Sequence, residues 1–176
     1  MRKIQILTDS TADLSKELIE QHNLGILPLC VNIDNKQYRD GIDLTAKEMY
    51  EIADKTNSHP KTSTSAIQDI YDFFVSYLKE DVDVIYTGIG SGMSSSYQYA
   101  HMVRDMIEEK HPEYVGRMHI IDSANLSTGI GLQILEADRL IKEGLDIEDI
   151  IMRLQDYKER VDASFIIDTP NGYFII

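Results

Sequence analysis

Serine, threonine, glycine and aspartate side chains that could bind an anion gather at a few places in this chain. The richest stretch, residues 87–100, reads TGIGSGMSSSYQYA, with Gly88, Gly90 and Gly92 followed by serines 94–96. Glycines allow positive φ angles and let another group approach the backbone closely. Serines at a helix start can satisfy the free N–H groups there, where the helix dipole also favours an anion. The stretch predicts a corner that binds a small anion, although the same residues are also common in ordinary turns and caps.

Two further polar clusters, Asp9-Ser10-Thr11 and residues 122–127, follow runs that are typical of buried strands. Parallel strands bring their carboxyl ends to one edge of a sheet, and ligands of α/β proteins bind beyond that edge. We therefore expect Asp9, Ser10 and Ser123 at the rim of a pocket centred on the glycine stretch.

The apolar periodicity predicts strands that alternate with helices. The predicted strands are residues 3–8, 26–33, 82–86, 117–121 and 163–168, and helices are predicted to begin near residues 14, 45, 66, 100, 128 and 146. Pro28 indicates that the second strand lies at an edge or carries a bulge. Two capping boxes, Thr45–Glu48 and Ser65–Gln68, mark helix starts. This alternation predicts an α/β fold, a parallel sheet with helices on both faces.

A hydroxyl-rich loop is predicted for residues 56–65, which read TNSHPKTSTS. Pro60 directs His59 away from helical geometry. Because four consecutive hydroxyls, 62–65, serve no packing purpose, we expect this loop near the glycine stretch.

Composition excludes several classes of function. The chain of 176 residues has 17 basic and 30 acidic residues, a net charge of −13, and no basic cluster with interleaved aromatics. Nucleic acids and anionic membrane surfaces are therefore not expected partners. The only cysteine, Cys30, rules out a disulfide framework and indicates a reducing compartment. No apolar run approaches the ~20 residues of a membrane span, so we expect a cytoplasmic protein.

Signatures of enzymes fit poorly. No lysine stands in residues 88–96, which excludes a Walker loop, and the glycine spacing is not that of a dinucleotide-binding turn. Gly92-Met93-Ser94 is similar to a nucleophile elbow, which requires the order Ser, acid, His. After Asp105 only His111 and His119 remain, the first predicted at a helix end and the second inside a strand. The five histidines lack metal-ligand spacing, so we expect no metal and no cofactor. A pocket of hydroxyls and amides favours binding over turnover. The alternative is an enzyme, either a hydrolase that uses Ser94 or a phosphoryl-transfer domain that uses Asp9.

Four motifs, dispersed in order along nearly the whole chain, together resemble the DegV family. They are Asp9-Ser10-Thr11-Ala12-Asp13-Leu14; Thr62-Ser63; Ser91-Gly92-Met93-Ser94 with Tyr97, Gln98 and Ala100; and Asp122-Ser123 with Ser127, Gly129 and Gly131. The resemblance implies a fatty-acid-binding protein, which in some members presents its lipid to the kinase partner of a bacterial fatty acid kinase. It further implies that Thr62 and Ser94 hydrogen-bond the carboxylate, with Ser63, Ser91 and the Gly92 amide near it.

The resemblance also implies a second α+β domain, which closes an apolar tunnel for the acyl chain and is largely absent here. Residues 1–168 would then form the N-terminal α/β domain, and residues 169–176 a short tail where the second domain would begin. The sequence departs from the family pattern at positions 64–65, 95–96 and after Thr169. Leaving half of a long acyl chain in water would cost on the order of 5 kcal/mol, at about 0.8 kcal/mol for each CH₂. A fragment or interaction domain with a vestigial lipid pocket is therefore a second alternative.

Overall fold

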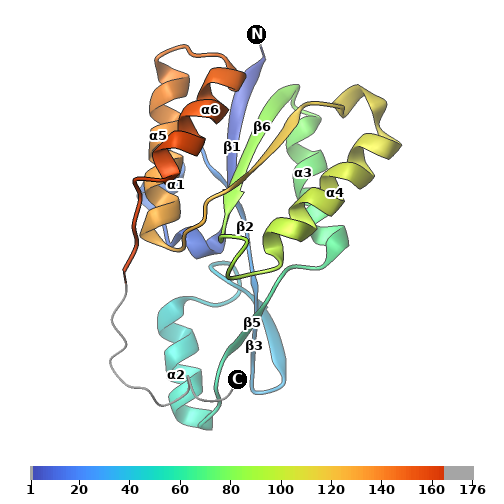
Figure 1. Cartoon of the computed structure of the whole chain (residues 1–176). Coiled ribbons are helices and arrows are strands. Elements are labelled where there is room, and N and C mark those ends of the chain that lie inside the picture. The colour runs from blue at the N-terminus through green and yellow to red at the C-terminus, as the bar shows by residue number, and fades with distance from the viewer. Residues whose placement is uncertain (1, 165–176) are drawn as a thin grey trace.

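The computed structural model of the protein describes residues 2–164, which form two sheets joined by helices (Figure 1). The larger sheet has the order β2-β1-β6-β7, and all three pairings are parallel. Its strands are β1 (Lys3–Asp9), β2 (Gly25–Leu27), β6 (Val82–Gly88) and β7 (Met118–Asp122). The predicted parallel sheet is thus confirmed, and the carboxyl ends of its strands lie at one edge.

Helices cover both faces of this sheet, as predicted. On one face α3 (Ile67–Leu78) and α4 (Ser96–Lys110) pack, and on the other lie α1 (Lys16–Gln21), α5 (Thr128–Lys142) and α6 (Ile147–Lys158) (Figure 1). The central strand β6 explains the two layers, because its side chains alternate between them. Val84 and Tyr86 belong to the core under α3 and α4, whereas Ile85 belongs to the core under α5.

The second sheet is small and antiparallel, and it lies beyond the carboxyl ends of the larger sheet together with α2 (Ala46–Thr56) (Figure 1). Its order is β4-β3-β5, formed by β3 (Cys30–Ile33), β4 (Lys36–Arg39) and β5 (Lys61–Ser63). Asp34 and Asn35 make the tight turn between β3 and β4, and both have positive φ angles. Such angles match the twist of a two-residue hairpin.

The prediction of one strand over residues 26–33 is wrong. The run divides at Pro28, so that β2 joins the large sheet and β3 joins the small one. Two side chains hold the segment Pro28-Leu29, which connects the two sheets. Ser65 Oγ donates to the Pro28 carbonyl, and Ser10 Oγ accepts from Leu29 N at 3.1 Å. The apolar pattern could not reveal the break, since each half is buried in its own sheet.

Three local predictions also need correction. Residues 61–63 of the predicted hydroxyl loop form strand β5, which pairs with β3. The Ser65–Gln68 capping box does not form: Ala66 is the N-cap of α3, without a side-chain bond. A 3-10 helix, η1 (Ser10–Ala12), precedes α1, whose N-cap is Ser15. The Thr45 capping box, in contrast, is confirmed at the start of α2.

The predicted strand 163–168 lies almost wholly outside the described residues, as do the predicted boundary at 168 and the tail 169–176. A second 3-10 helix, η2 (Pro112–Tyr114), completes the elements of residues 2–164. No helix in this range combines the length and the apolar character needed to cross a membrane.

Candidate functional site

Hydroxyl groups from both sheets line one cleft of about 770 Å³ at the edge where the parallel strands end. From β5 and the residue after it come Thr62, Ser63 and Thr64, and from the turn before α4 come Ser94 and Ser95. The predicted proximity of the hydroxyl segment to the glycine stretch is therefore confirmed. Leu29, Ile89, Met93, Tyr99 and Leu126 add apolar surface to the same cleft.

A chain of hydroxyl contacts joins the small sheet to the start of α4. Thr64 Oγ1 lies 3.2 Å from Ser96 Oγ, which lies 2.9 Å from Ser94 Oγ. Ser96 is only 5% exposed, so it links the other two from inside. Sequence reasoning missed the role of Thr64 and Ser96, because contact between residues 32 positions apart leaves no local signal.

The start of α4 keeps part of its backbone available to a ligand. Ser94 Oγ accepts a hydrogen bond from Ser96 N at 3.2 Å, whereas the N-cap residue Ser95 makes no side-chain cap bond. Among residues 2–164, no acceptor is placed to bond the backbone N–H of the N-cap Ser95, or that of Gly92, which precedes the helix and is not among the residues that line the cleft. Free N–H groups at the positive end of a helix dipole are a recurrent anion-binding arrangement. Serine capping of this helix is thus only partly as predicted.

The three glycines of the stretch are not required for positive φ angles, and two of them allow close approach of neighbouring groups. None of Gly88, Gly90 and Gly92 has a positive φ. A Cβ on Gly88 would meet the Asp9 carboxylate, and one on Gly90 would lie 2.8 Å from the backbone N of Asn125. Around Gly92 there is no atom within 4 Å of the Cβ position. The first two glycines therefore let the loop pack, and the third leaves room beside it.

Asp9, at the end of β1, is a buried carboxylate that binds its own protein. It is 1% exposed and accepts hydrogen bonds from the N–H and hydroxyl of Thr11, from Ile89 N at 3.0 Å and from Tyr86 Oη at 3.3 Å. Burial raises the pKa of Asp9, and these donors only partly offset that effect. Its neighbour Tyr86 has a pKa raised well above its ordinary value, first by burial and then by the Asp9 charge.

Asp122, at the end of β7, is a second carboxylate that accepts hydrogen bonds from its own protein, on the side of β6 opposite to Asp9. Its carboxylate accepts from Ser91 N at 2.9 Å, Ser91 Oγ at 2.5 Å and Ala124 N at 3.0 Å. Partial burial favours the neutral acid, but the bonds from Ser91 and Ala124 and the charge of Lys158 outweigh it and lower the pKa of Asp122. The hydroxyl of Ser91, expected beside a bound carboxylate, is directed to Asp122.

Ser123 was expected at the pocket rim, but it lies beneath the loop that follows β6 and lines neither cavity. Its side chain is fully buried, and its Oγ donates to the Gly88 carbonyl at 2.6 Å.

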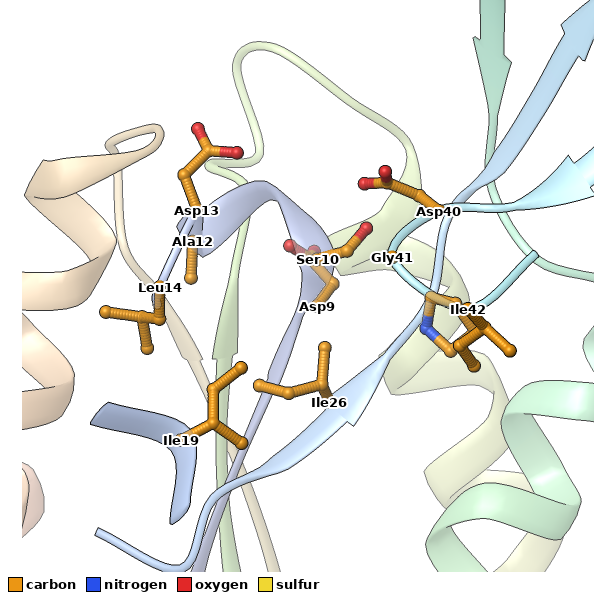
Figure 2. A pocket seen from close by; sticks show the side chains of 11 residues that line it. Asp9, Ser10, Ala12, Asp13, Leu14, Ile19, Ile26, Asp40, Gly41 and Ile42 are labelled. Atoms are coloured by element: carbon orange, nitrogen blue, oxygen red, sulfur yellow. The ribbon is translucent and has the colours of Figure 1, made fainter. Parts of the chain in front are cut away.

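A second cavity, of about 450 Å³, adjoins the cleft (Figure 2). Its apolar wall is formed by Ala12, Leu14, Ile19, Ile26, Pro28 and Ile42. Asp9 and Ser10, expected at the rim of the pocket at the glycine stretch, line this second cavity and not the hydroxyl cleft, whereas Asp13 and Asp40 line both. Figure 2 shows the carboxylates of Asp13 and Asp40 at one end and Ile19 and Ile26 at the other. Within the described part of the chain, neither lining includes a lysine, arginine or histidine.

The site lacks the partners of an activated nucleophile. Ser94 Oγ contacts only Ser96 among the hydrogen-bonding groups of residues 2–164, with neither a histidine nor a carboxylate in reach. A hydrolase needs a base beside the nucleophile. The described residues also contain no group of three or more side chains placed to hold a metal ion. The arrangement of these described residues can donate hydrogen bonds to an anion.

Residues 3–171 match the family model described as "Uncharacterised protein, DegV family". Among curated proteins, a DegV domain-containing protein of Clostridium perfringens is 32% identical over 169 residues, 96% of this chain and 58% of the relative. Another, of Clostridium acetobutylicum, is 38% identical over 150 residues, 85% of this chain and 52% of the relative. The chain thus spans little more than half the length of the curated relatives it matches.

Solved structures agree with this match. A stearic-acid-binding protein from Eubacterium ventriosum is 32% identical, with a TM-score of 0.80 over 86% of this chain and 52% of that one. DegV of Bacillus subtilis, a fatty-acid-binding protein, is also 32% identical, with a TM-score of 0.79 over 90% of this chain and 55% of that one. Fold, motifs and the family match over nearly the whole sequence agree, and this chain belongs to the DegV family.

Proposed function

We propose that this chain binds a long-chain fatty acid, holding the carboxylate in the hydroxyl cleft. Thr62 and Ser94 donate to the carboxylate oxygens, with Ser63 and the Gly92 amide beside them. The observation that carries the proposal is the cleft itself, where hydroxyls from β5 and the start of α4 converge next to an apolar cavity. The fatty-acid-binding relatives with the same fold support it.

The donors suit a carboxylate although none is charged. A hydrogen bond to a charged group contributes roughly 1.5–3 kcal/mol, more than a bond between neutral groups. The start of α4 adds the positive end of its dipole, equivalent to about half a unit charge. Since no base or activated nucleophile accompanies Ser94, we propose binding without catalysis.

The adjoining cavity suits the acyl chain. Leu14, Ile19, Ile26 and Ile42 give it an apolar wall. Each buried CH₂ contributes about 0.8 kcal/mol, so even eight methylenes placed there would contribute about 6 kcal/mol. The acyl chain, more than the head group, would then supply most of the affinity.

We further propose that the bound acid is presented to a kinase partner, which phosphorylates its carboxylate. Met93 and Tyr99, 47% and 37% exposed, border the cleft and offer apolar surface for a partner. The kinase supplies the catalytic groups, so acyl phosphate should form only when the kinase, ATP and this chain are combined.

The test is native mass spectrometry of the purified chain, followed by analysis of released lipid and by titration with palmitate and oleate. The wild type should carry or take up one fatty acid, and the double variant Thr62→Ala, Ser94→Ala should bind at least ten times more weakly. Ser76→Ala is the matched control, because the Ser76 hydroxyl bonds only to Phe73 O on the surface of α3. An empty wild type that takes up neither acid would contradict the proposal and favour an interaction domain with a vestigial pocket.

A further inference from the structure

Four consecutive residues, from Gly88 at the end of β6 to Ser91 in the loop that follows, are held by groups at or just after the ends of the two neighbouring strands. The contacts are Ser123 Oγ to Gly88 O at 2.6 Å, Ile89 N to Asp9 Oδ2 at 3.0 Å, Gly90 N to Asn125 O at 2.9 Å, and Ser91 N and Oγ to the Asp122 carboxylate at 2.9 and 2.5 Å. In the sheet order, β6 lies between β1 and β7. Asp9 and Asp122 are the last residues of those two strands. One carboxylate on each flank therefore fixes the loop.

These carboxylates are engaged with protein donors and not with the cleft. Asp9 accepts from Thr11 through Oδ1 and from Ile89 N through Oδ2. Asp122 accepts from Ser91 N and Ala124 N through Oδ1 and from Ser91 Oγ through Oδ2. Neither Asp122 nor Ser91 lines the hydroxyl cleft, and Asp9 lines only the apolar cavity. Gly92 and Ser94 come directly after the last fixed residue, so their placement depends on where the loop is held.

We infer that Asp9 and Asp122 are positioning residues for the carboxylate-binding groups: they hold residues 89–91 so that the Gly92 N–H and Ser94 Oγ face the ligand. Ser91 then acts through Asp122 and does not touch the fatty acid. This inference rests on the proposed function. Its physical basis is that donors fixed before binding lose less conformational freedom when the ligand arrives.

Variants of Asp122 separate positioning from charge. Asp122→Ala and Asp122→Asn both remove a negative charge near the ligand, which by itself would strengthen binding of an anion. Asparagine keeps an oxygen for the N–H groups of Ser91 and Ala124, and its amide nitrogen can donate to Ser91 Oγ. We expect Asp122→Ala to weaken palmitate binding about tenfold and Asp122→Asn to restore it to within about threefold of the wild type. Equal affinities in the two variants would overturn the inference.

The matched control is Asp146→Ala, which removes a carboxylate that accepts from Asp149 N at 2.9 Å at the start of α6. It should not change palmitate affinity. Amide hydrogen exchange gives a readout without ligand: exchange at residues 89–94 should be faster in Asp122→Ala and unchanged in Asp146→Ala. Weaker binding with unchanged exchange would overturn positioning in favour of direct contact. If the wild type binds no fatty acid, the proposed function fails. Faster exchange at residues 89–94 in Asp122→Ala would still support the claim that Asp122 holds the loop in place.

Discussion

Replacing Gly90 by alanine should damage the loop that forms the centre of the candidate site. A Cβ at this position would lie 2.8 Å from Asn125 N and 2.9 Å from both the carbonyl carbon and the Cα of Ala124. Ordinary van der Waals contact begins near 3.4 Å, so the loop would have to retreat by 3.4 − 2.8, or about 0.6 Å. All three opposing atoms belong to the backbone, and no rotation of a side chain can relieve the clash.

The expected cost follows from two effects of the Gly90 substitution. Overpacking against a fixed neighbour costs about 1–3 kcal/mol, and the bond from Gly90 N to Asn125 O, 2.9 Å long, would stretch and lose part of about 1 kcal/mol. The lower entropy of the unfolded chain with alanine returns about 0.4–1 kcal/mol. The free energy of unfolding should fall by about 1–3 kcal/mol, a decrease in Tm of about 2–12 °C for a domain of this size.

The assay is thermal and urea unfolding followed by circular dichroism, with Gly92→Ala as the control. Gly92 has no atom within 4 Å of its Cβ position and no positive φ, so its alanine variant should melt at or slightly above the wild-type temperature. The reasoning is refuted if Gly90→Ala melts within 1 °C of the wild type, or if the two alanine variants lose the same stability.

Three other predictions follow from the charges and caps. Asp40→Asn should strengthen palmitate binding a few-fold at low salt and less at high salt, measured by titration calorimetry, because Asp40 lines both cavities and no lysine, arginine or histidine is among their described lining residues. Carboxyl NMR should give Asp9 a pKa above 3.8, so its contribution to the free energy of unfolding is present below pH 3.8 and is lost as the pH rises through the pKa of the folded protein. The same measurement should give Asp122 a pKa below 3.8, so its contribution is lost as the pH falls through the pKa of the folded protein. Thr45→Ala should lower stability by about 1 kcal/mol in urea unfolding, because the N-cap of α2 is lost.

Local patterns predicted the layers of the fold but not the path between its sheets. The apolar runs of β1 and β6, which are buried at nearly every position, and the helical periodicity of α3 and α5 are properties of short windows, and both faces of the large sheet are as expected. The division at Pro28 is not a local property. Whether residues 30–33 extend the large sheet or start another depends on β5, about 30 residues later, which pairs with them.

At the candidate site, too, the sequence indicates which residue types are present but not which partner each side chain bonds. The sequence predicted that Thr62 and Ser94 share a site, and both line one cleft. Ser91 and Ser123 were also expected at this site, because each follows a predicted strand end, where a hydroxyl can reach a ligand. The structure directs both inward, to Asp122 and to the Gly88 carbonyl. Only the packing of β7 beside β6 decides between the two directions.

An acidic chain that binds an anion must do so against its own field, and the structure indicates how. The carboxylates of Asp9 and Asp122 are turned into the protein as acceptors, so hydroxyls and amides are left to face the cleft. With no cation in the described lining and with Asp13 and Asp40 nearby, the head group gains little from long-range attraction. Affinity should then depend mainly on the acyl chain, at about fourfold for each methylene buried. Under the proposed function, such a site would select a fatty acid by the length of acyl chain it can bury, and its hydroxyls would determine which end of the molecule is held.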